Sequence, residues 1–246
     1  MPKKHHLVFG GSRGMGKEMV NTLCKLDKVS LFGRNLKTAG IGKDVNIFES
    51  DFTDIDRVVE LLAAAVKKNG KIDSVIFLQR FRGEDPELNN NFYISVQFAQ
   101  KIIDESLGKK YFKTHKQTNS VIFISSVADT YIAPEQPLGY HIGKAGVAQM
   151  TKYFAFNLAA HNIRVNCISP CVVMKKEARA YYKKNPKLND LFKKHIPLKR
   201  MGEAADIINL VQFLSSNAAS YITGQNIVVD GGLTLQTHES LIKAFN

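Results

Sequence analysis

Short apolar runs alternate with segments of helical periodicity along the whole chain, and this alternation constrains the fold more than any other feature. The apolar runs are typical of strands, and they are HHLVFG, VSLFG, VNIFES, DSVIFL, SVIFISS, IRVNCIS and QNIVVDGG. Helical patterns separate most of them, and one, DIDRVVELLAAAVKKNG, is expected to begin after an N-cap at Asp54 and to end at Gly70. Strands that alternate with helices predict a parallel sheet covered on both faces. We therefore predict a doubly wound, three-layer α/β fold.

The composition fits one globular domain over residues 1–246, because 44% of the residues are hydrophobic and no linker-like stretch interrupts the pattern. The chain has no apolar run of membrane-spanning length, and the apolar run near its start is too short for a signal peptide, so we expect a cytoplasmic protein. Its three cysteines, Cys24, Cys167 and Cys171, form no CxxC pair. Neither a disulfide framework nor a metal site is predicted.

The net charge of +12, from 34 Lys and Arg against 22 Asp and Glu, favours acidic partners. The chain lacks zinc-finger spacing and the aromatic-basic motifs of RNA-binding domains, so nucleic-acid binding is not predicted, nor is a membrane partner. The charge alone does not choose which kind of acidic partner the protein binds.

A glycine-rich stretch, VFGGSRGMGKEM, follows the first expected strand and places Gly10, Gly14 and Gly16 in a G-x3-G-x-G spacing. Glycines there allow a tight turn and let backbone N–H groups approach a pyrophosphate at the positive end of the next helix. A plain turn is the alternative, but the position between strand and helix favours a dinucleotide site.

A second motif, YHIGK, puts Tyr140 and Lys144 on one face of an expected helix. An ammonium group beside a phenol stabilises the phenolate, as a tyrosine acting as acid or base requires. Such a pair also occurs by chance, but Ser126 lies upstream at the end of the strand in VIFISSV. That is the edge where open α/β sheets bind ligands, and a hydroxyl there could hold a carbonyl.

These motifs together resemble the short-chain dehydrogenase/reductase family, whose members have a Rossmann-type fold, and in particular its 3-oxoacyl-carrier-protein reductase-like members. The resemblance spans nearly the whole chain, through GGSRGMG, DFTD, ISS, YHIGK, IRVNCISP and the C-terminal PLKRMGEAADIINLVQFLSSNAASYITGQNIVVDGG. It implies that Tyr140 is the general acid or base, that Lys144 assists it and holds the nicotinamide ribose, and that Ser126 orients the substrate carbonyl. The family's proton-relay asparagine maps to Asn91, for which a helix N-cap is the alternative.

The resemblance also implies a nicotinamide cofactor. Arg34 follows the second strand, where an acidic residue would select NAD(H), and Arg13 lies in the glycine loop; two guanidinium groups suit a 2′-phosphate, so NADP(H) is expected over NAD(H). A merely solvated Arg34 is the alternative. The expected cofactor-binding residues are Gly10, Ser12, Arg13, Gly14, Met15, Gly16, Arg34, Asn35, Asp51, Phe52, Leu78, Gln79, Tyr140, Lys144, Pro170 and Val173.

The chain departs from the family where the fourth strand ends. The family's Asn-Asn-Ala-Gly is replaced by Phe77, Leu78, Gln79 and Arg80. Loss of the asparagines removes hydrogen bonds that need a compensation. We expect Arg80 or Arg82 to bind a substrate carboxylate or phosphate near Ser126, with solvent-facing arginines as the alternative.

The region at about 171–200 is expected to cover the substrate, as in the family. It begins with Cys171 in place of the family's glycine, places Lys175 where a threonine is usual, and carries Tyr181 and Tyr182 among many lysines. The lysines indicate an anionic substrate or an acidic carrier protein, or form a solvated helical face. Cys171 is expected to contribute packing rather than line the site.

The sequence therefore predicts an NADPH-dependent oxidoreductase that interconverts a carbonyl and a secondary alcohol, on an anionic keto sugar derivative or an oxoacyl substrate. A catalytically silent protein that senses NADP(H) is the alternative. Family members are commonly tetramers joined through helices four and five and the C-terminal strand. The apolar AGVAQMTKYFAF and ITGQNIVVDGG fit that pattern, so a homo-oligomer, tetramer or dimer, is expected.

Overall fold

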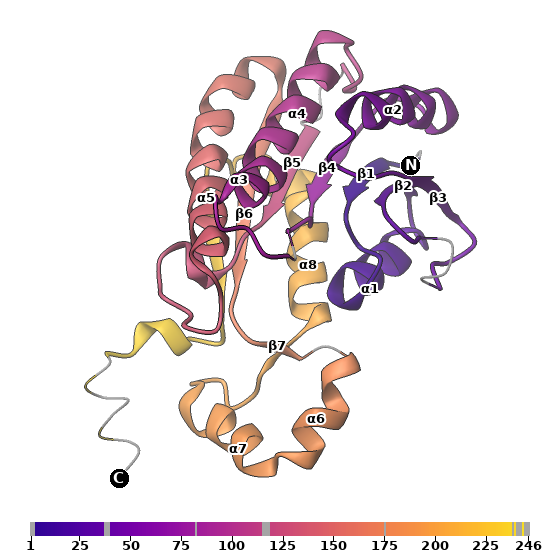
Figure 1. Cartoon of the computed structure of the whole chain (residues 1–246). Coiled ribbons are helices and arrows are strands. Elements are labelled where there is room, and N and C mark those ends of the chain that lie inside the picture. The colour runs from indigo at the N-terminus through magenta and orange to yellow at the C-terminus, as the bar shows by residue number, and fades with distance from the viewer. Residues whose placement is uncertain are drawn as a thin grey trace.

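The computed structural model describes residues 3–36, 40–81, 83–114, 119–174, 176–237, 239 and 243, so Arg82 and Lys175 lie outside the described residues. Seven parallel strands form one sheet in the order β3-β2-β1-β4-β5-β6-β9 (Figure 1). Their bounds are β1 His5–Phe9, β2 Lys28–Gly33, β3 Val45–Glu49, β4 Ser74–Phe77, β5 Asn119–Ile124, β6 Ile163–Pro170 and β9 Asn226–Val229. All seven strands expected from the apolar runs are present, which confirms the predicted parallel sheet.

Helices cover both faces of this sheet. Their bounds are α1 Gly14–Leu23, α2 Ile55–Asn69, α3 Asn89–Phe92, α4 Phe98–Gly108, α5 Leu138–Leu158, α6 Arg179–Lys184, α7 Pro186–His195 and α8 Ala204–Leu214. Because side chains alternate along a strand, Leu7 and Phe9 of β1 pack toward α2, α4 and α5, whereas Val8 packs toward α1 and α8. The three-layer arrangement is thus confirmed (Figure 1).

Helix α2 begins and ends where its sequence predicts. The carboxylate of Asp54 accepts a hydrogen bond from the backbone N–H of Arg57 at 3.1 Å, and Gly70 follows the helix with a φ of 89°. A positive φ costs glycine little, so the chain reverses there without strain.

Five phenylalanines form a row across the sheet on the α2–α4–α5 side, one from each of five neighbouring strands. Strand register places Phe48, Phe32, Phe9, Phe77 and Phe123 side by side in that order. Neighbouring rings stack with centroid distances of 5.1, 4.7, 5.3 and 5.1 Å. At the first of the altered strand-end positions, where the family has an asparagine, Phe77 thus carries a ring stacked on both sides.

The helical stretch that leads into α4 is interrupted. A five-residue π-helical segment, Tyr93–Gln97, joins α3 to α4. The side-chain amide of Gln79, at the end of β4, donates to the Ile94 carbonyl within it at 3.2 Å. Segments of this kind often mark functional sites, and here one ties the altered strand end to the start of α4.

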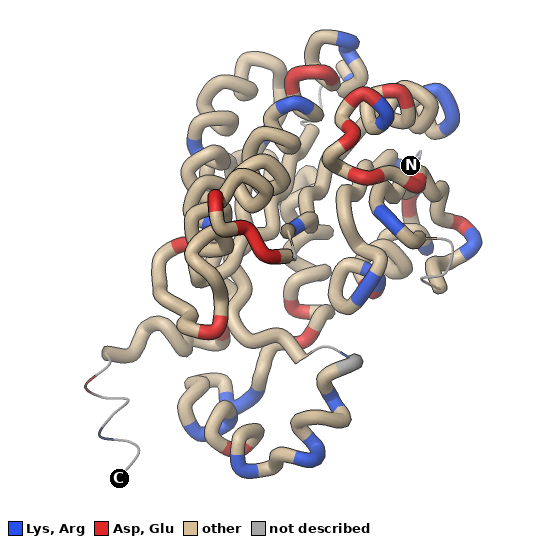
Figure 2. The backbone as a smooth tube through the Cα atoms, in the orientation of Figure 1, with Lys and Arg blue, Asp and Glu red and all other residues tan. Residues whose placement is uncertain are grey.

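The lysine-rich region folds into two largely exposed helices, α6 and α7, as the alternative of a solvated helical face anticipated. They lie beyond the carboxyl end of β6, where a two-stranded ribbon of β7 (Val173–Met174) and β8 (Gly202–Glu203) returns the chain to the body (Figure 1). Figure 2 shows Lys and Arg along both helices. None of the described helices is both long and apolar enough to span a membrane.

Two buried histidines lie at the opposite, amino-terminal end of β1. His5 contacts the Gly70 carbonyl through Nδ1 at 2.7 Å and the Ser30 hydroxyl through Nε2 at 2.8 Å. His6 faces the other side of the sheet, where its Nε2 lies 3.1 Å from the Asp27 carboxylate. Burial lowers the pKa of His5 to about 4, from an ordinary value of 6.5.

Stability should therefore fall in mild acid because of His5. The native state holds this ring neutral, while the unfolded chain binds a proton below pH 6.5, so the free energy of unfolding decreases from pH 6.5 down to about 4. The contribution lost between pH 7 and pH 5 is about 2 kcal/mol. Urea unfolding at pH 7 and pH 5 measures this loss. In His5→Gln the free energy of unfolding should depend less on pH, whereas in His161→Gln, at an exposed position, its pH dependence should stay as in the wild type.

Candidate active site

The glycine loop forms the predicted turn between β1 and α1. Gly10 and Gly14 have φ values of 86° and 52°, and a Cβ on Gly16 would lie 2.6 Å from the Cα of Gly11. Helix α1 begins at Gly14, without an acidic residue in its first turn and without a side-chain cap from Arg13. The N-terminus of α1 carries a partial positive charge, and the glycines let a ligand come close to the backbone N–H groups. This arrangement suits a pyrophosphate. Ser12 lies within this loop, and Met15 packs partly against the α1–α8 core.

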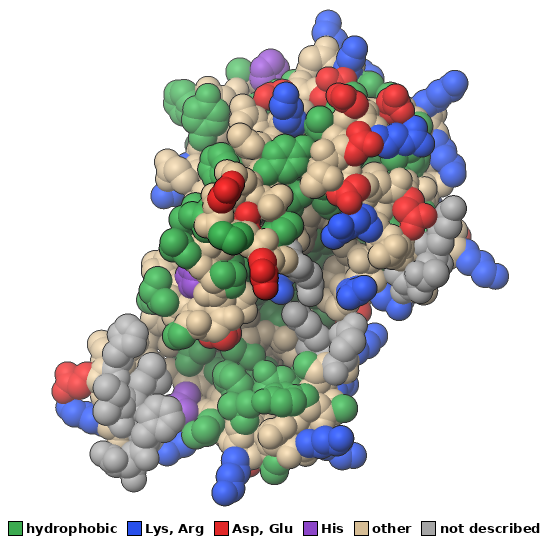
Figure 3. Space-filling view, viewed as in Figure 1, with side chains coloured by type: hydrophobic (Ala, Val, Ile, Leu, Met, Phe, Trp, Pro, Cys, Tyr) green, Lys and Arg blue, Asp and Glu red, His purple; other side chains and the backbone are tan. Residues whose placement is uncertain are grey.

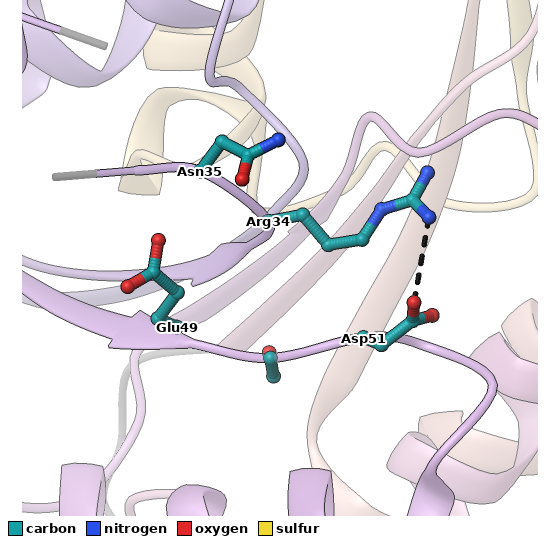
Figure 4. Close-up of a pocket in the computed structure, with 5 residues that line it drawn as sticks. Arg34, Asn35, Glu49 and Asp51 are labelled. Carbon is teal, nitrogen blue, oxygen red and sulfur yellow. Dashed lines mark hydrogen bonds and ion pairs between the residues drawn. The ribbon is translucent and has the colours of Figure 1, made fainter. Parts of the chain in front are cut away.

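A shallow pocket lies where β2 and β3 end, and Arg34, Asn35, Glu49, Ser50 and Asp51 line it (Figure 4). The Arg34 guanidinium lies 3.4 Å from the Asp51 carboxylate. A hydrogen bond from the Thr53 backbone N–H is the largest contribution that lowers the pKa of Asp51, and the Arg34 charge lowers it further. This is the expected place for the adenosine half of a dinucleotide.

Two further residues lie near this pocket. The ring of Phe52 packs against the core, 4.6 Å from the ring of Phe98, and its expected part in binding the cofactor stays a prediction. Glu49, which the sequence reasoning missed, lines the pocket and accepts a hydrogen bond from the Leu36 backbone N–H at 2.9 Å. Its position as the last residue of β3 was the available signal.

Lys144 and Tyr140 come together on α5, as their spacing predicts. The Lys144 side chain is buried, donates to the Ile124 carbonyl at 2.8 Å and lies 5.7 Å from the centre of the Tyr140 ring. Burial lowers the pKa of Lys144 to about 8; the charge of Arg80 lowers it as well, while Cys167 and Asp129 raise it. The group thus remains mostly cationic at neutral pH, beside the phenol.

Ser126 begins the short 3₁₀ turn Val127–Asp129 directly after β5, and its hydroxyl accepts from the Ala128 backbone N–H at 3.2 Å. Asp129 at the end of this turn accepts from the Ser169 hydroxyl at 2.6 Å and from the Asn226 side-chain amide at 2.9 Å. The turn that carries Ser126 is therefore fixed to β6 and β9. Sequence reasoning missed this carboxylate, which had no motif to mark it.

Asn91 is buried in α3 against the first turn of α5. Its side-chain amide donates to the Asp85 carboxylate at 2.8 Å, and a Cβ on Gly139 would lie 2.8 Å from its Nδ2. The alternative role as N-cap is wrong, because α3 begins at Asn89 and Asp85 accepts the backbone N–H groups of Asn90 and Asn91. The proton-relay role stays a prediction.

The altered end of β4 reaches the catalytic residues. The guanidinium carbon of Arg80 lies 5.5 Å from the centre of the Tyr140 ring, and the Arg80 side chain is exposed. Gln79 is buried, and a Cβ on Gly10 would lie 3.0 Å from its backbone N. Leu78 packs partly against the α1–α8 core. Arg80 thus lies beside Tyr140, and its role in binding the substrate stays a prediction.

The remaining predicted residues lie after β6. Pro170 is its last residue, and Val173 pairs with Gly202 in the small ribbon. Cys171 is half-buried, and its backbone N–H donates to the Val229 carbonyl at 3.2 Å. Among the described residues, no cluster of His, Cys, Asp and Glu could hold a metal ion.

Residues 23–234 match a family model described as "Enoyl-(Acyl carrier protein) reductase" (adh_short_C2), which covers most of the chain. The chain belongs to the short-chain dehydrogenase/reductase family. It is therefore an oxidoreductase of a family that uses nicotinamide cofactors and acts on alcohol and carbonyl groups.

Similar proteins with assigned activities fall into two groups. A 3-oxoacyl-(acyl-carrier-protein) reductase FabG of Thermotoga maritima is 28% identical over 249 residues, covering 93% of this chain and 97% of that protein. A D-arabinitol 2-dehydrogenase (ribulose-forming) of Candida albicans is 29% identical over 206 residues, covering 76% of this chain and 70% of that protein.

Solved structures share the fold. A short-chain type dehydrogenase/reductase from Mycobacterium ulcerans superposes with a TM-score of 0.82 at 25% identity and covers 96% of this chain and 91% of its own. The ligand-free aldohexose dehydrogenase of Thermoplasma acidophilum also gives 0.82, at 22% identity, with 96% of each chain covered.

Proposed function

We propose that this protein is an NADPH-dependent reductase, or dehydrogenase in the reverse direction, that interconverts a carbonyl and a secondary alcohol on an anionic small molecule. The observation that carries the proposal is the pair of cations around one phenol: Lys144 and Arg80 lie 5.7 and 5.5 Å from the centre of the Tyr140 ring. The Lys144 ammonium suits a tyrosine that transfers a proton, because it stabilises the phenolate. The Arg80 guanidinium is exposed and can bind an anionic group of the substrate.

Each catalytic residue has a defined task in this proposal. When bound, NADPH supplies the hydride that the carbonyl carbon accepts. Tyr140 gives its proton to the carbonyl oxygen, which becomes the hydroxyl of the product. Lys144 stabilises the phenolate left behind, and Ser126, held by its fixed turn, donates a hydrogen bond to the carbonyl oxygen. Asn91 would pass a proton back from solvent toward Lys144 and Tyr140.

The preference for NADPH rests on Arg34 and Arg13. Arg34 is exposed at the end of β2, and its present partner Asp51 is itself satisfied by Thr53, so the guanidinium is available to a 2′-phosphate. Replacing Arg34 by Ala should raise the KM for NADPH about tenfold or more and change the KM for NADH little. Kinetics with both cofactors check this, and a wild-type KM for NADH equal to or below that for NADPH would contradict the preference.

A substrate panel tests the activity itself. NADPH oxidation is followed with keto acids, keto sugars and oxoacyl thioesters. Turnover of any of them supports the proposal, whereas tight NADPH binding without turnover would favour the silent sensor. The lysines of α6 and α7, with Lys183, Lys184, Lys193 and Lys194 near the ends of these helices, support an anionic substrate and leave room for an acidic carrier protein.

We also propose that the protein is cytoplasmic and forms a homo-oligomer, either a tetramer or a dimer. Tyr153 and Phe156 are exposed on α5, and Tyr221 and Val228 are exposed around β9, which are the surfaces expected to join subunits. Light scattering that detected only monomer would contradict this expectation.

A further inference from the structure

The position of Arg80 limits how far the anionic group of the substrate can lie from its reacting carbonyl. The guanidinium carbon is 5.5 Å from the centre of the ring that carries the Tyr140 hydroxyl. Given the proposed function, on which this inference rests, we propose that the substrate is a short oxo acid, a 2-oxo or 3-oxo carboxylate or the matching hydroxy acid.

The reach of the two side chains supports this class. A carbonyl held by a phenol and a carboxylate held by a guanidinium each lie about 2.7–2.9 Å from the atoms that bind them. With the guanidinium carbon 5.5 Å from the centre of the phenol ring, we expect one molecule to bridge both groups only when few bonds separate its carbonyl from its carboxylate. A phosphate at the far end of an extended sugar would overshoot Arg80 when its carbonyl reached Tyr140.

The charges around Arg80 leave it available. Among the described residues no carboxylate forms an ion pair with it. Asp85, which follows Arg80 closely in sequence, already accepts hydrogen bonds from Asn90 and Asn91. Asp129 is held by Ser169, Asn226 and Thr130. An exposed guanidinium beside a catalytic phenol and without a protein counter-ion suits a carboxylate ligand.

Helices α6 and α7, which are expected to cover the substrate, favour an oxo acid whose remaining part is apolar. The rings of Tyr181 and Tyr182 lie 5.4 Å apart and that of Phe192 lies 6.0 Å from Tyr182, so α6 and α7 meet through aromatic contacts. Figure 3 shows hydrophobic side chains gathered over these helices, below a hollow of the surface. Such a surface matches a hydrocarbon or aromatic group better than the hydroxyls of a sugar.

Paired substrates test the inference. Short 2-oxo and 3-oxo acids are compared with their methyl esters, which keep the carbonyl and lose the charge. We expect kcat/KM with NADPH to favour the acid by roughly 10–100-fold, the range of a hydrogen-bonded charge pair. Arg80→Met should remove this preference by slowing the acid alone, and Arg80→Lys should keep part of it. Arg57→Met, at an exposed arginine of α2, is the matched control and should change nothing.

A binding measurement separates the possible failures. The affinity of the matching hydroxy acid for the NADP⁺ complex, from calorimetry, should fall in Arg80→Met while the affinity for NADPH stays unchanged. Equal slowing of acid and ester in Arg80→Met would overturn the inference, because Arg80 would then act on Tyr140. A wild type that prefers neutral ketones would overturn it while the proposed reductase stands. No turnover of any carbonyl compound would overturn the proposed function itself.

Discussion

Replacing Tyr140 by Phe should lower kcat by roughly 10²–10⁴-fold, the usual contribution of a positioned general acid. The ring itself would remain, with Lys144 and Arg80 at 5.7 and 5.5 Å from its centre, so the cation–ring contacts and the packing of α5 persist. Only the proton donor is lost. NADPH affinity, measured by fluorescence titration, should therefore change by less than about tenfold, since the phenol hydroxyl contributes one hydrogen bond at most.

The same helix provides the control. Tyr153 lies on α5 with 64% of its surface exposed, and Tyr153→Phe should keep wild-type kcat and fold equally well. Single-turnover rates under saturating NADPH separate chemistry from product release. A Tyr140→Phe protein that retained more than about a tenth of the wild-type rate would show that another group supplies the proton.

Local sequence patterns were sufficient to predict the fold and the spacing of the candidate catalytic residues. Because side chains alternate along a strand, Leu7 and Val8 lie on opposite faces of β1. Tyr140 and Lys144 are four residues apart in α5, so they lie on one face of that helix, as their spacing predicts. The place of Arg80 also followed from sequence, because a residue just beyond β4 must lie at the carboxyl edge of the sheet.

Contacts between distant segments were not predictable in the same way. Asp129 meets Ser169 and Asn226 only because the turn after β5 lies beside β6 and β9, and no local pattern predicts that these three side chains meet. The boundaries of α6 and α7 were not predictable for another reason. Their sequence is crowded with lysine and exposed along most of its length, and the ring contacts between Tyr182 and Phe192 that join the two helices appear only in the fold.

The phenylalanine row is the clearest case of information that appears only in three dimensions. Its members belong to strands whose order across the sheet, β3-β2-β1-β4-β5, differs from their order along the chain. Each phenylalanine alone predicts only a buried strand position. Stacking from Phe48 through Phe9 to Phe123 follows once the register is known.

Phe77→Asn, which restores the residue that the family has at this strand end, should therefore destabilise this protein. Phe77 is 2% exposed and stacks on Phe9 and Phe123 at 5.3 and 5.1 Å. Removing a buried ring costs about 3–5 kcal/mol, and an amide left between two phenylalanine rings without a partner adds about 1–3 kcal/mol. Urea unfolding at pH 7 measures the loss.

Two further variants make the result interpretable. Phe77→Leu keeps an apolar side chain and should cost less than Phe77→Asn, so it reports on the row even if the asparagine variant fails to fold. Leu26→Asn, at a 63% exposed position after α1, should cost less than about 0.5 kcal/mol. An asparagine variant as stable as the wild type would mean that the strand end tolerates either chemistry. The expected loss would instead mean that Phe77 depends on its stacked neighbours, so that the family's strand end cannot be restored one residue at a time.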